Sequence, residues 1–309
     1  MDSGLLGRIV DVLNDYYIVQ RWKYLTLNKN TKEYSTQQFY KNSKTNKYPP
    51  LTDTALQYHL KNGNTLGVCC AYISSQYVSK FLTFDIDSLD TQITDKVIAQ
   101  LRKDKIYDIA VSFSGGKGYH VDIFFDNCIP IGVLDTYYQH ILQSTGLIKL
   151  KHGSNFVVEM RPTEGYGVKL PLGHNWTHDG NNYCCYVDYR NGYVPIDTAF
   201  VPGMFAHIEK IDSNWFRLLC DGLEKESCKN QAKQYSEIKA KHKMLPQYQQ
   251  GTDLDITVDA LQRLEEQGLP CLHSRVKVCS SWQDIIIIVV LKGKTAKILY
   301  CMDATARQE

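Results

Sequence analysis

Residues 78–83 form an apolar-rich run that predicts a β-strand, and this run leads directly into Phe-Asp-Ile-Asp at positions 84–87. Side chains alternate along a strand, so Asp85 and Asp87 project from the same face with Cα atoms roughly 6.6 Å apart. Two such carboxylates repel each other at neutral pH unless a cation lies between them, and hard divalent cations prefer oxygen ligands. The pattern therefore predicts a strand that presents a Mg²⁺ or Mn²⁺ site.

A glycine-rich turn follows about 25 residues later, in Ser-Phe-Ser-Gly-Gly-Lys-Gly-Tyr-His at 112–120, between apolar runs that predict two strands. Such a turn can point backbone N–H groups at an anion, while Ser114, Lys117 and His120 donate hydrogen bonds to its oxygens. The same glycines also suit an ordinary hairpin turn. A carboxylate pair beside an anion-binding turn suggests phosphoryl chemistry.

A further acid, Glu159, lies in an apolar run at 156–162 that predicts a later strand. Alternation puts Val157, Glu159 and Arg161 on one face, which is consistent either with function or with a salt bridge on a solvated strand. Asp122 is a competing third acid, because it shares a face with His120. We rank Asp122 below Glu159, since a strand acid beside an exposed turn is expected to be solvated.

Together these residues resemble the archaeo-eukaryotic primase superfamily of DNA and RNA polymerases. Residues 82–87 match its first motif, apolar residues that end in Asp-x-Asp, and residues 114–120 match its Ser-Gly-x-Gly-x-His motif. Glu159 fits the acidic third motif. Residues 168–174, with Lys-Leu-Pro-Leu-Gly, resemble primase-polymerases from bacterial mobile-element, conflict-system and CRISPR-associated contexts.

The resemblance implies an α/β (α+β) fold in which an N-terminal αβ module packs on an RRM-like catalytic module. It implies a template-dependent primase-polymerase, which is a nucleotidyltransferase. Its expected partners are nucleoside triphosphates, a DNA template and a primer. A helicase, or proteins of a CRISPR system or mobile element, are expected as further partners. Asp85, Asp87 and Glu159 would be the catalytic acids and would hold two Mg²⁺ or Mn²⁺ ions. The nucleotide-binding set would be Ser114, Gly116, Lys117, Gly118, His120, Arg161, Lys169 and His174.

The charge distribution adds a candidate template surface. The net charge is only +2, which excludes a global basic field. Residues 21–47 nevertheless contain seven basic residues and one acid, interleaved with aromatic side chains. Basic and aromatic residues neutralise a phosphate backbone and stack on bases, so we expect template binding at Lys41, Lys44 and Lys47. A solvated loop with its aromatic rings in the core is the alternative.

The domain organisation follows from composition. We expect a catalytic domain over 1–223, a polar linker over 224–254 and a small C-terminal element over 255–309. The phrase Gly-Leu-Pro-Cys at 268–271 resembles, with one proline missing, the start of accessory primase domains. Cys271, His273 and Cys279 could share a metal with Cys220 or Cys228, but their spacing is irregular.

The ten cysteines follow no secretory signal, which favours reduced thiols and a cytoplasmic protein. No apolar segment reaches the length of a membrane-spanning helix, so no membrane partner is expected. Apolar periodicity predicts helices at 4–20, 93–106, 135–144, 204–223 and 256–267. It predicts strands at 66–73, 80–86, 108–114, 120–125, 183–188 and 285–291.

Two other classes of function stay open at this point. A sugar-nucleotide transferase could use Asp85 and Asp87 as its metal-binding Asp-x-Asp, but it would not require the glycine-rich turn with His120. A non-catalytic nucleic-acid-binding replication or defence subunit could use an RRM-like scaffold. Clustered acids argue against the second class, because they would face a polyanion.

Overall fold

The computed structural model describes residues 2–40, 49–152, 155–180, 182–225, 254–257, 285–292 and 295–302. The chain divides into two compact units, residues 1–232 and 233–309. The described part of the second unit is an antiparallel sheet in the order β14-β16-β15, formed by β14 (Leu254–Thr257), β15 (Ile285–Lys292) and β16 (Thr295–Met302). The acids, nucleotide-binding residues and template-binding residues predicted from the sequence all belong to the first unit.

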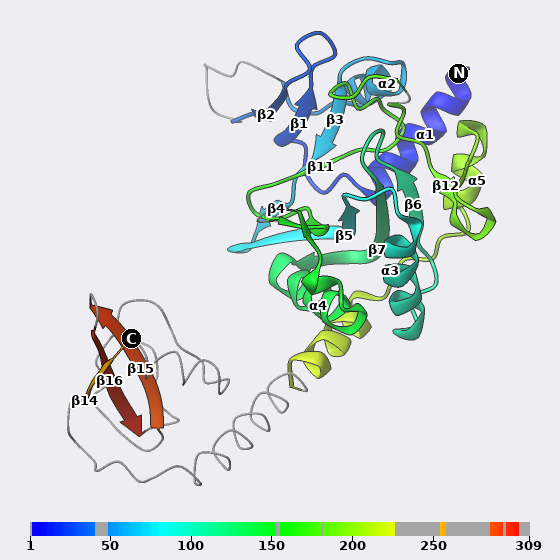
Figure 1. Cartoon of the computed structure of the whole chain (residues 1–309). Coiled ribbons are helices and arrows are strands. Elements are labelled where there is room, and N and C mark those ends of the chain that lie inside the picture. The colour runs from blue at the N-terminus through cyan, green and yellow to red at the C-terminus, as the bar shows by residue number, and fades with distance from the viewer. Residues whose placement is uncertain are drawn as a thin grey trace. The chain divides into compact units, whose positions relative to one another are not determined.

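The central sheet of the first unit has the β-α-β-β-α-β order of an RRM-like module (Figure 1). Its elements are β5 (Gln76–Ile86), α3 (Thr91–Lys103), β6 (Ala110–Phe113), β7 (Tyr119–Pro130), α4 (Ile131–Thr145) and β10 (Val158–Arg161). The strands lie in the order β10-β5-β7-β6 with antiparallel neighbours, and β4 (Ala71–Ile73) pairs with one end of β5. The expected RRM-like fold of this module is therefore confirmed.

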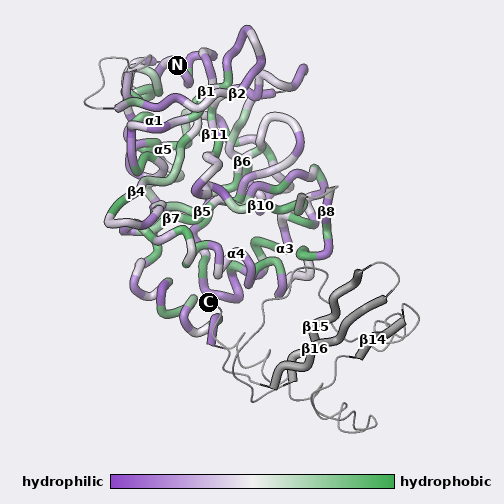
Figure 2. The backbone as a smooth tube through the Cα atoms, turned by 90° about the vertical axis from the view of Figure 1, so that its left-hand side faces the viewer, coloured by the Kyte–Doolittle hydropathy of each residue, from purple (hydrophilic) through white to green (hydrophobic). Residues whose placement is uncertain are grey.

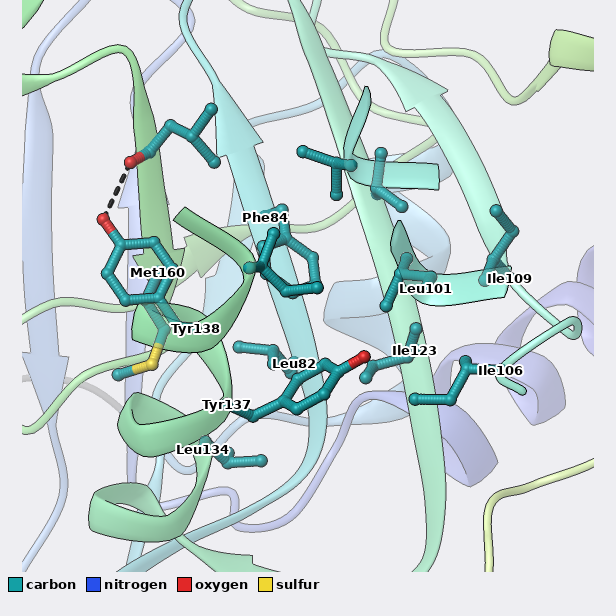
Figure 3. Close-up of a cluster of buried hydrophobic side chains, with 14 of the residues drawn as sticks. Leu82, Phe84, Leu101, Ile106, Ile109, Ile123, Leu134, Tyr137, Tyr138 and Met160 are labelled. Carbon is teal, nitrogen blue, oxygen red and sulfur yellow. Dashed lines mark hydrogen bonds between the residues drawn. The ribbon is translucent and has the colours of Figure 1, made fainter. Parts of the chain in front are cut away.

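Helices α3 and α4 cover one face of this sheet (Figures 1 and 3). Every second side chain of the central strands enters this core, including Leu82, Phe84, Ile86, Val121, Ile123, Phe125, Val158 and Met160. Each such side chain contributes about 1.5–3 kcal/mol when fully buried. The helix ends are set locally, since Asp90 accepts a hydrogen bond from the Gln92 N–H at 3.0 Å and Gly146 ends α4 with a φ of +73°.

The N-terminal module is a second antiparallel sheet, in the order β11-β3-β1-β2, with two helices. Its elements are α1 (Ser3–Tyr16), β1 (Lys23–Leu27), β2 (Tyr34–Gln38), α2 (Asp53–Leu60), β3 (Thr65–Val68) and β11 (Val168–Lys169). Strand β11 follows the catalytic strands in the sequence but pairs with β3. After β10, the chain thus returns to the N-terminal module and joins it to the RRM-like module.

The remaining elements are short. They are β8 (Lys151–His152), β9 (Asn155–Phe156), β12 (Val187–Asp188), β13 (Val194–Pro195), α5 (Val201–Phe205), a helix over 213–225, and 3₁₀ turns at Leu147–Lys149, Tyr189–Asn191 and Thr198–Phe200. Hydrophobic and hydrophilic stretches alternate along the backbone near α4, as expected for a helix with one buried face (Figure 2). Among the described residues, no helix combines the length and apolar character needed to span a bilayer.

Among the described residues, the second face of the central sheet is covered at one end of β5 and accessible at the other. Phe81, Thr83 and Asp85 share this face of β5, and Asp87 follows one residue beyond the strand. Phe81 and Thr83 are 0% exposed, whereas the side chain of Asp85 is 26% exposed and Asp87 is exposed. The ring of Tyr17, at the end of α1, lies 5.1 Å from Phe81. The exposure of this face therefore increases along β5 towards Asp85.

A buried carboxylate joins the two modules beneath this boundary. Asp122 is 1% exposed and accepts hydrogen bonds from the Tyr17 hydroxyl at 2.6 Å and the Thr83 hydroxyl at 2.6 Å. The Tyr17 and Tyr186 hydroxyls lie 3.0 Å apart. Burial raises the pKa of Asp122, although His120 and the two hydrogen bonds act in the opposite direction. The expectation that Asp122 is solvated is wrong, because α1 covers it.

The glycine-rich turn packs directly against the end of β5. It is closed by a 2.8 Å hydrogen bond from the Ser114 N–H to the Gly118 carbonyl, and Gly115 has a φ of +76°. A Cβ atom on Gly118 would lie 1.9 Å from the Ile86 carbonyl oxygen. Only glycine fits at position 118, and the turn therefore lies beside Asp87.

Four predicted elements differ from the structure. The strand predicted over 183–188 is reduced to β12 at Val187–Asp188. The predicted strand 66–73 is wrong as one element, because β3 and β4 join different sheets; both parts are apolar, so the pattern could not separate them. The predicted helix 204–223 is interrupted between α5 and the helix over 213–225. Residues 256–257 lie in β14 and not in a helix, because Ile256 pairs with Ala296.

Several predictions fall outside the described residues. These are the template-binding residues Lys41, Lys44 and Lys47, the metal candidates Cys228, Cys271, His273 and Cys279, and most of the linker.

Replacing Tyr17 by Phe removes one donor to the buried Asp122 carboxylate. We expect Tyr17→Phe to lower the free energy of unfolding by about 1–3 kcal/mol, as for hydrogen bonds to buried acceptors. Tyr58→Phe is the matched control, because Tyr58 is 61% exposed. The measurement is urea unfolding of the wild type and of both variants. Equal unfolding midpoints for Tyr17→Phe and Tyr58→Phe would show that the Tyr17–Asp122 hydrogen bond does not stabilise the packing of α1 on the sheet.

Replacing Gly118 by Ala places a methyl group against the end of β5. We expect Gly118→Ala to destabilise the protein by about 1–3 kcal/mol, as for other overpacked sites. Gly7→Ala is the control, because a Cβ atom at Gly7 meets nothing within 4 Å and helix α1 gains about 1 kcal/mol from alanine. Thermal unfolding compares the two, and a tolerated Gly118→Ala would contradict the close packing.

Candidate active site

Three of the predicted site residues lie in one row across the open end of the catalytic sheet. Glu159 on β10 pairs with Asp85 on β5, and Asp85 pairs with His120 on β7. On β6 the next position in the row is Ser112, the partner of His120. Directly opposite residues in antiparallel strands have Cβ atoms about 4.5–5.5 Å apart. Strand pairing thus brings together residues that are far apart in the sequence.

Asp85 is the centre of this row. Its carboxylate lies 3.3 Å from His120 Nε2 and 4.0 Å from Arg161 Nε. Burial raises the pKa of Asp85, but His120, Arg161 and Lys169 outweigh it and hold this pKa below its ordinary value. Asp85 is therefore ionised at neutral pH, with the protein's own cationic side chains beside it.

Glu159 forms the salt bridge that alternation along β10 allows. The Arg161 guanidinium donates to the Glu159 carboxylate and, at 3.1 Å, to the Met160 carbonyl. The same guanidinium lies 5.4 Å from the centre of the Tyr166 ring. Arg161 thus links Glu159 and Asp85 and adds positive charge at the acids.

Asp87 completes the predicted acid set at the end of β5. It is exposed, and its N–H donates to the Val157 carbonyl at 2.8 Å, which ties it to the start of β10. In the described parts of the chain, no three His, Cys, Asp or Glu side chains are grouped as metal ligands. The donor chemistry of Asp85, Asp87 and Glu159 nevertheless fits a hard divalent cation, because all three supply oxygen atoms and two are cross-strand neighbours.

The turn next to Asp87 is held by contacts from the other module. The Ser114 carbonyl accepts from the Lys169 ammonium on β11, from the Cys184 thiol at 3.3 Å and from the Asn175 amide at 3.5 Å. The Ser114 hydroxyl accepts from the Gly118 N–H at 3.2 Å. Lys169 and Ser114 are therefore brought together, and both hold the shape of the turn.

The other residues of the turn differ in accessibility. Lys117 is exposed, whereas His120 is 6% exposed. A Cβ atom on Gly116 would lie 2.5 Å from the His178 ring, so this glycine also allows close packing. The backbone of the turn is fixed by its neighbours, and Lys117 is its accessible cationic side chain.

His174 packs among aromatic side chains. Its ring stacks on Trp176 at 4.8 Å and contacts Tyr183 at 5.1 Å, and its Nδ1 atom is buried without a hydrogen-bond partner. Burial and the nearby Lys29 lower the pKa of His174, so its ring is neutral at pH 7. The His174 side chain thus contacts aromatic rings, while the next residue, Asn175, contacts the turn at the Ser114 carbonyl.

Sequence reasoning missed side chains that reach the site from other elements. Cys184 and Asn175 contact the Ser114 carbonyl from the segment after β11. No local sequence pattern marks these residues, because each contact is made across the module boundary.

A cavity of about 380 Å³ lies beside Glu159. Helix α4, strand β10 and the residues after β10 contribute its lining residues, which are Asp135, Tyr138, Glu159, Met160, Arg161, Thr163 and Tyr166. The cavity therefore adjoins the acid row at β10, on the side away from the turn between β6 and β7.

Comparisons with solved structures find matches of low overall similarity. A crystal structure of primase RepB′ is 9% identical, with a TM-score of 0.39 over 78% of this chain and 68% of that chain. The archaeo-eukaryotic primase domain of cyanophage S-2L primase-polymerase is 12% identical, with a TM-score of 0.31 over 67% and 98% of the chains. The polymerase domain of Mycobacterium tuberculosis Ligase D, in complex with DNA, is 11% identical, with a TM-score of 0.31 over 70% and 87%.

The family comparison gives a clear result, whereas no curated protein matches the chain. The family model of the archaeo-eukaryotic primase domain of the TOTE conflict system matches residues 13–219. This range contains the whole acid row, the glycine-rich turn and strand β11. The chain therefore belongs to the archaeo-eukaryotic primase domain family of TOTE conflict systems.

Proposed function

We propose that this protein is a template-dependent primase-polymerase, a DNA-directed nucleotidyltransferase. The observation that carries the proposal is the row of Glu159, Asp85 and His120, with Asp87 and the glycine-rich turn at its accessible end. Membership in the primase domain family supports the same reaction class. The substrates are a nucleoside or deoxynucleoside triphosphate, a DNA template, and a primer or an initiating nucleotide.

The reaction joins the 3′-oxygen of one nucleotide to the α-phosphorus of the next. The bond between that phosphorus and the oxygen bridging to the β-phosphate breaks, pyrophosphate leaves, and the 3′-hydroxyl loses its proton. Mg²⁺ or Mn²⁺, held by Asp85, Asp87 and Glu159, would activate the 3′-hydroxyl and neutralise the triphosphate and the departing pyrophosphate. The depressed pKa of Asp85 keeps this ligand ionised at neutral pH.

The remaining site residues act on the nucleotide. Lys117 and His120 contact the triphosphate, and the backbone of Ser114, Gly116 and Gly118 shapes the turn around it. Arg161 lies against two of the acids and is a phosphate contact.

Two residues after β10 support the same site. Lys169 holds the turn through the Ser114 carbonyl and lies close to the incoming nucleotide. His174, which stacks on Trp176, is a contact for the template or nucleotide further from the acids.

The template follows the basic and aromatic segment 21–47. Tyr34 is 52% exposed, and Trp22 is 49% exposed and stacks on Phe39 with a ring distance of 5.7 Å. Exposed aromatic rings stack on bases, and neighbouring lysines neutralise phosphates. Lys41, Lys44 and Lys47 are the proposed phosphate contacts. In this proposal residues 1–223 form the catalytic domain, 224–254 a linker and 255–309 a small C-terminal element.

Removing the paired aspartates tests the proposed chemistry. We expect Asp85→Ala with Asp87→Ala to lower nucleotide incorporation at least about 10³-fold, because metal-assisted stabilisation of the transition state amounts to several kcal/mol. Primer extension with dNTPs or NTPs and Mn²⁺ is the measurement. Asp11→Ala, at an exposed position of α1, is the matched control and should extend primers like the wild type.

Template binding and thermal unfolding separate chemistry from folding in this test. The double variant should bind a labelled primer-template as tightly as the wild type. Wild-type extension by a folded double variant would contradict the proposal. A wild type that binds DNA but never extends a primer would favour a non-catalytic nucleic-acid-binding subunit.

A further inference from the structure

We propose that Arg102, Tyr189 and Arg190 form a binding site for a backbone phosphate of a nucleic-acid strand, outside the candidate active site. This inference rests on the proposed function and deepens it, because it names a second place at which the DNA partner is held. The three side chains come from α3 and from the 3₁₀ turn at Tyr189–Asn191. They share no residue with the acid row, the glycine-rich turn or the basic and aromatic segment 21–47.

Two guanidinium groups converge on one phenol in this site. Arg102 Nη2 and Arg190 Nε each donate to the Tyr189 hydroxyl oxygen at 3.3 Å. The same two guanidinium groups lie over the Tyr189 ring, 5.6 Å and 5.5 Å from its centre. An aromatic ring attracts a cation placed over its face. The Tyr189 ring therefore holds two positive charges at one point of the surface, although they come from different elements.

Neither arginine is paired with a carboxylate in the part of the chain that the structure describes. The Asp188 carboxylate accepts from the backbone N–H of Arg190 at 3.1 Å. The hydrogen bond to Tyr189 raises the pKa of Arg190, and Asp188 and Asp108 act in the same direction without forming an ion pair with it. Two like charges held on one phenol repel each other. An anion that contacts both guanidinium groups would therefore stabilise this arrangement.

The donors of this site suit a phosphate group. The guanidinium group is a planar fork of N–H donors that matches the oxygens of a phosphate. The Tyr189 hydroxyl oxygen accepts from both arginines, so its own hydrogen can be donated to a third oxygen. Arg102 and Arg190 are exposed and Tyr189 is half-buried, which leaves the three donors within reach of a ligand from solvent.

The surface next to this site favours a nucleic-acid backbone over a single anion. Lys103 and Lys105 are exposed and follow Arg102 closely in the sequence, and Tyr107 is 58% exposed. Asp104, the acid between the two lysines, is bonded to side chains of α3 and α4. Several cations and an exposed ring on one segment suit a chain of phosphates that carries bases.

The position of Tyr189 also favours a strand that is bound at the acid row. Ser112, which continues the row on β6, forms a β-bridge with Tyr186. Tyr189 follows Tyr186 by three residues, which span no more than about 11 Å of chain. A strand that continues from the row past β6 can therefore place one of its phosphates at Tyr189. An acidic protein segment, the alternative occupant, would have no such connection to the row.

Binding of a labelled DNA single strand across a salt series tests the site without any catalytic step. We expect Arg102→Gln with Arg190→Gln to weaken binding at least about fivefold, and to lower the slope of log K against log[salt] by roughly 0.7 per lost phosphate contact. Arg8→Gln with Lys96→Gln is the matched control, because it removes the same charge from two other exposed positions. The control pair should keep the wild-type slope.

Conservative variants separate charge from hydrogen-bond geometry. Arg102→Lys with Arg190→Lys keeps both charges, so it should keep the wild-type salt slope while losing part of the affinity, because lysine lacks the planar fork. Thermal unfolding of every variant is the control for folding. If the double glutamine variant does not fold, Arg190→Gln alone, on the exposed turn, gives the same comparison with about half the effect on the slope.

An unchanged affinity and salt slope in the folded glutamine variant would overturn the inference, and so would an equal loss in the control pair. A polyglutamate peptide that binds through these arginines, while the DNA strand does not, would also overturn it and would identify an acidic protein as the occupant. Primer extension separates this result from the proposed function. A wild type that binds DNA through Arg102 and Arg190 but never extends a primer would contradict the proposed function and support the phosphate site.

Discussion

The packing of the end of α1 on one half of the catalytic sheet determines where the site can form. Tyr17 lies against Phe81 and donates to the buried Asp122 carboxylate, so this half of the sheet face is closed. The opposite face is occupied by α3 and α4. Within the described residues, the end of the sheet that carries Asp85 and Glu159 remains accessible, and the candidate active site lies where α1 leaves the sheet uncovered.

Several carboxylates lie at the accessible end of the sheet, and positively charged side chains from both modules lie beside them. Arg161 lies against Glu159 and Asp85, His120 lies against Asp85, and Lys169 from the N-terminal module holds the neighbouring turn. These neighbours hold the pKa of Asp85 below its ordinary value in spite of its burial, so Asp85 is ionised at neutral pH. In the proposed reaction, divalent cations and phosphates would replace part of this internal pairing.

Much of this arrangement could be predicted from the sequence, because a period of two fixes which side chains share a strand face. Asp85 and Asp87, His120 and Asp122, and Glu159 and Arg161 each follow that rule. Contacts that depend on which segments pack together could not be predicted: the burial of Asp122 under α1, and the cavity built from α4 and the turn at Tyr166. The single strand predicted over 66–73 is wrong for the same reason, since two apolar segments joined different sheets.

The central claim is that the cross-strand row of acids is the metal site of a nucleotidyltransferase. A crystal structure of the protein with Mn²⁺ and a non-hydrolysable nucleoside triphosphate tests it most directly, because Mn²⁺ is located by its anomalous scattering. We expect anomalous peaks for Mn²⁺ between the side chains of Asp85, Asp87 and Glu159, and the triphosphate at the turn that carries Lys117. Mn²⁺ bound away from these acids, with Glu159 still paired to Arg161 beside a bound nucleotide, would contradict it.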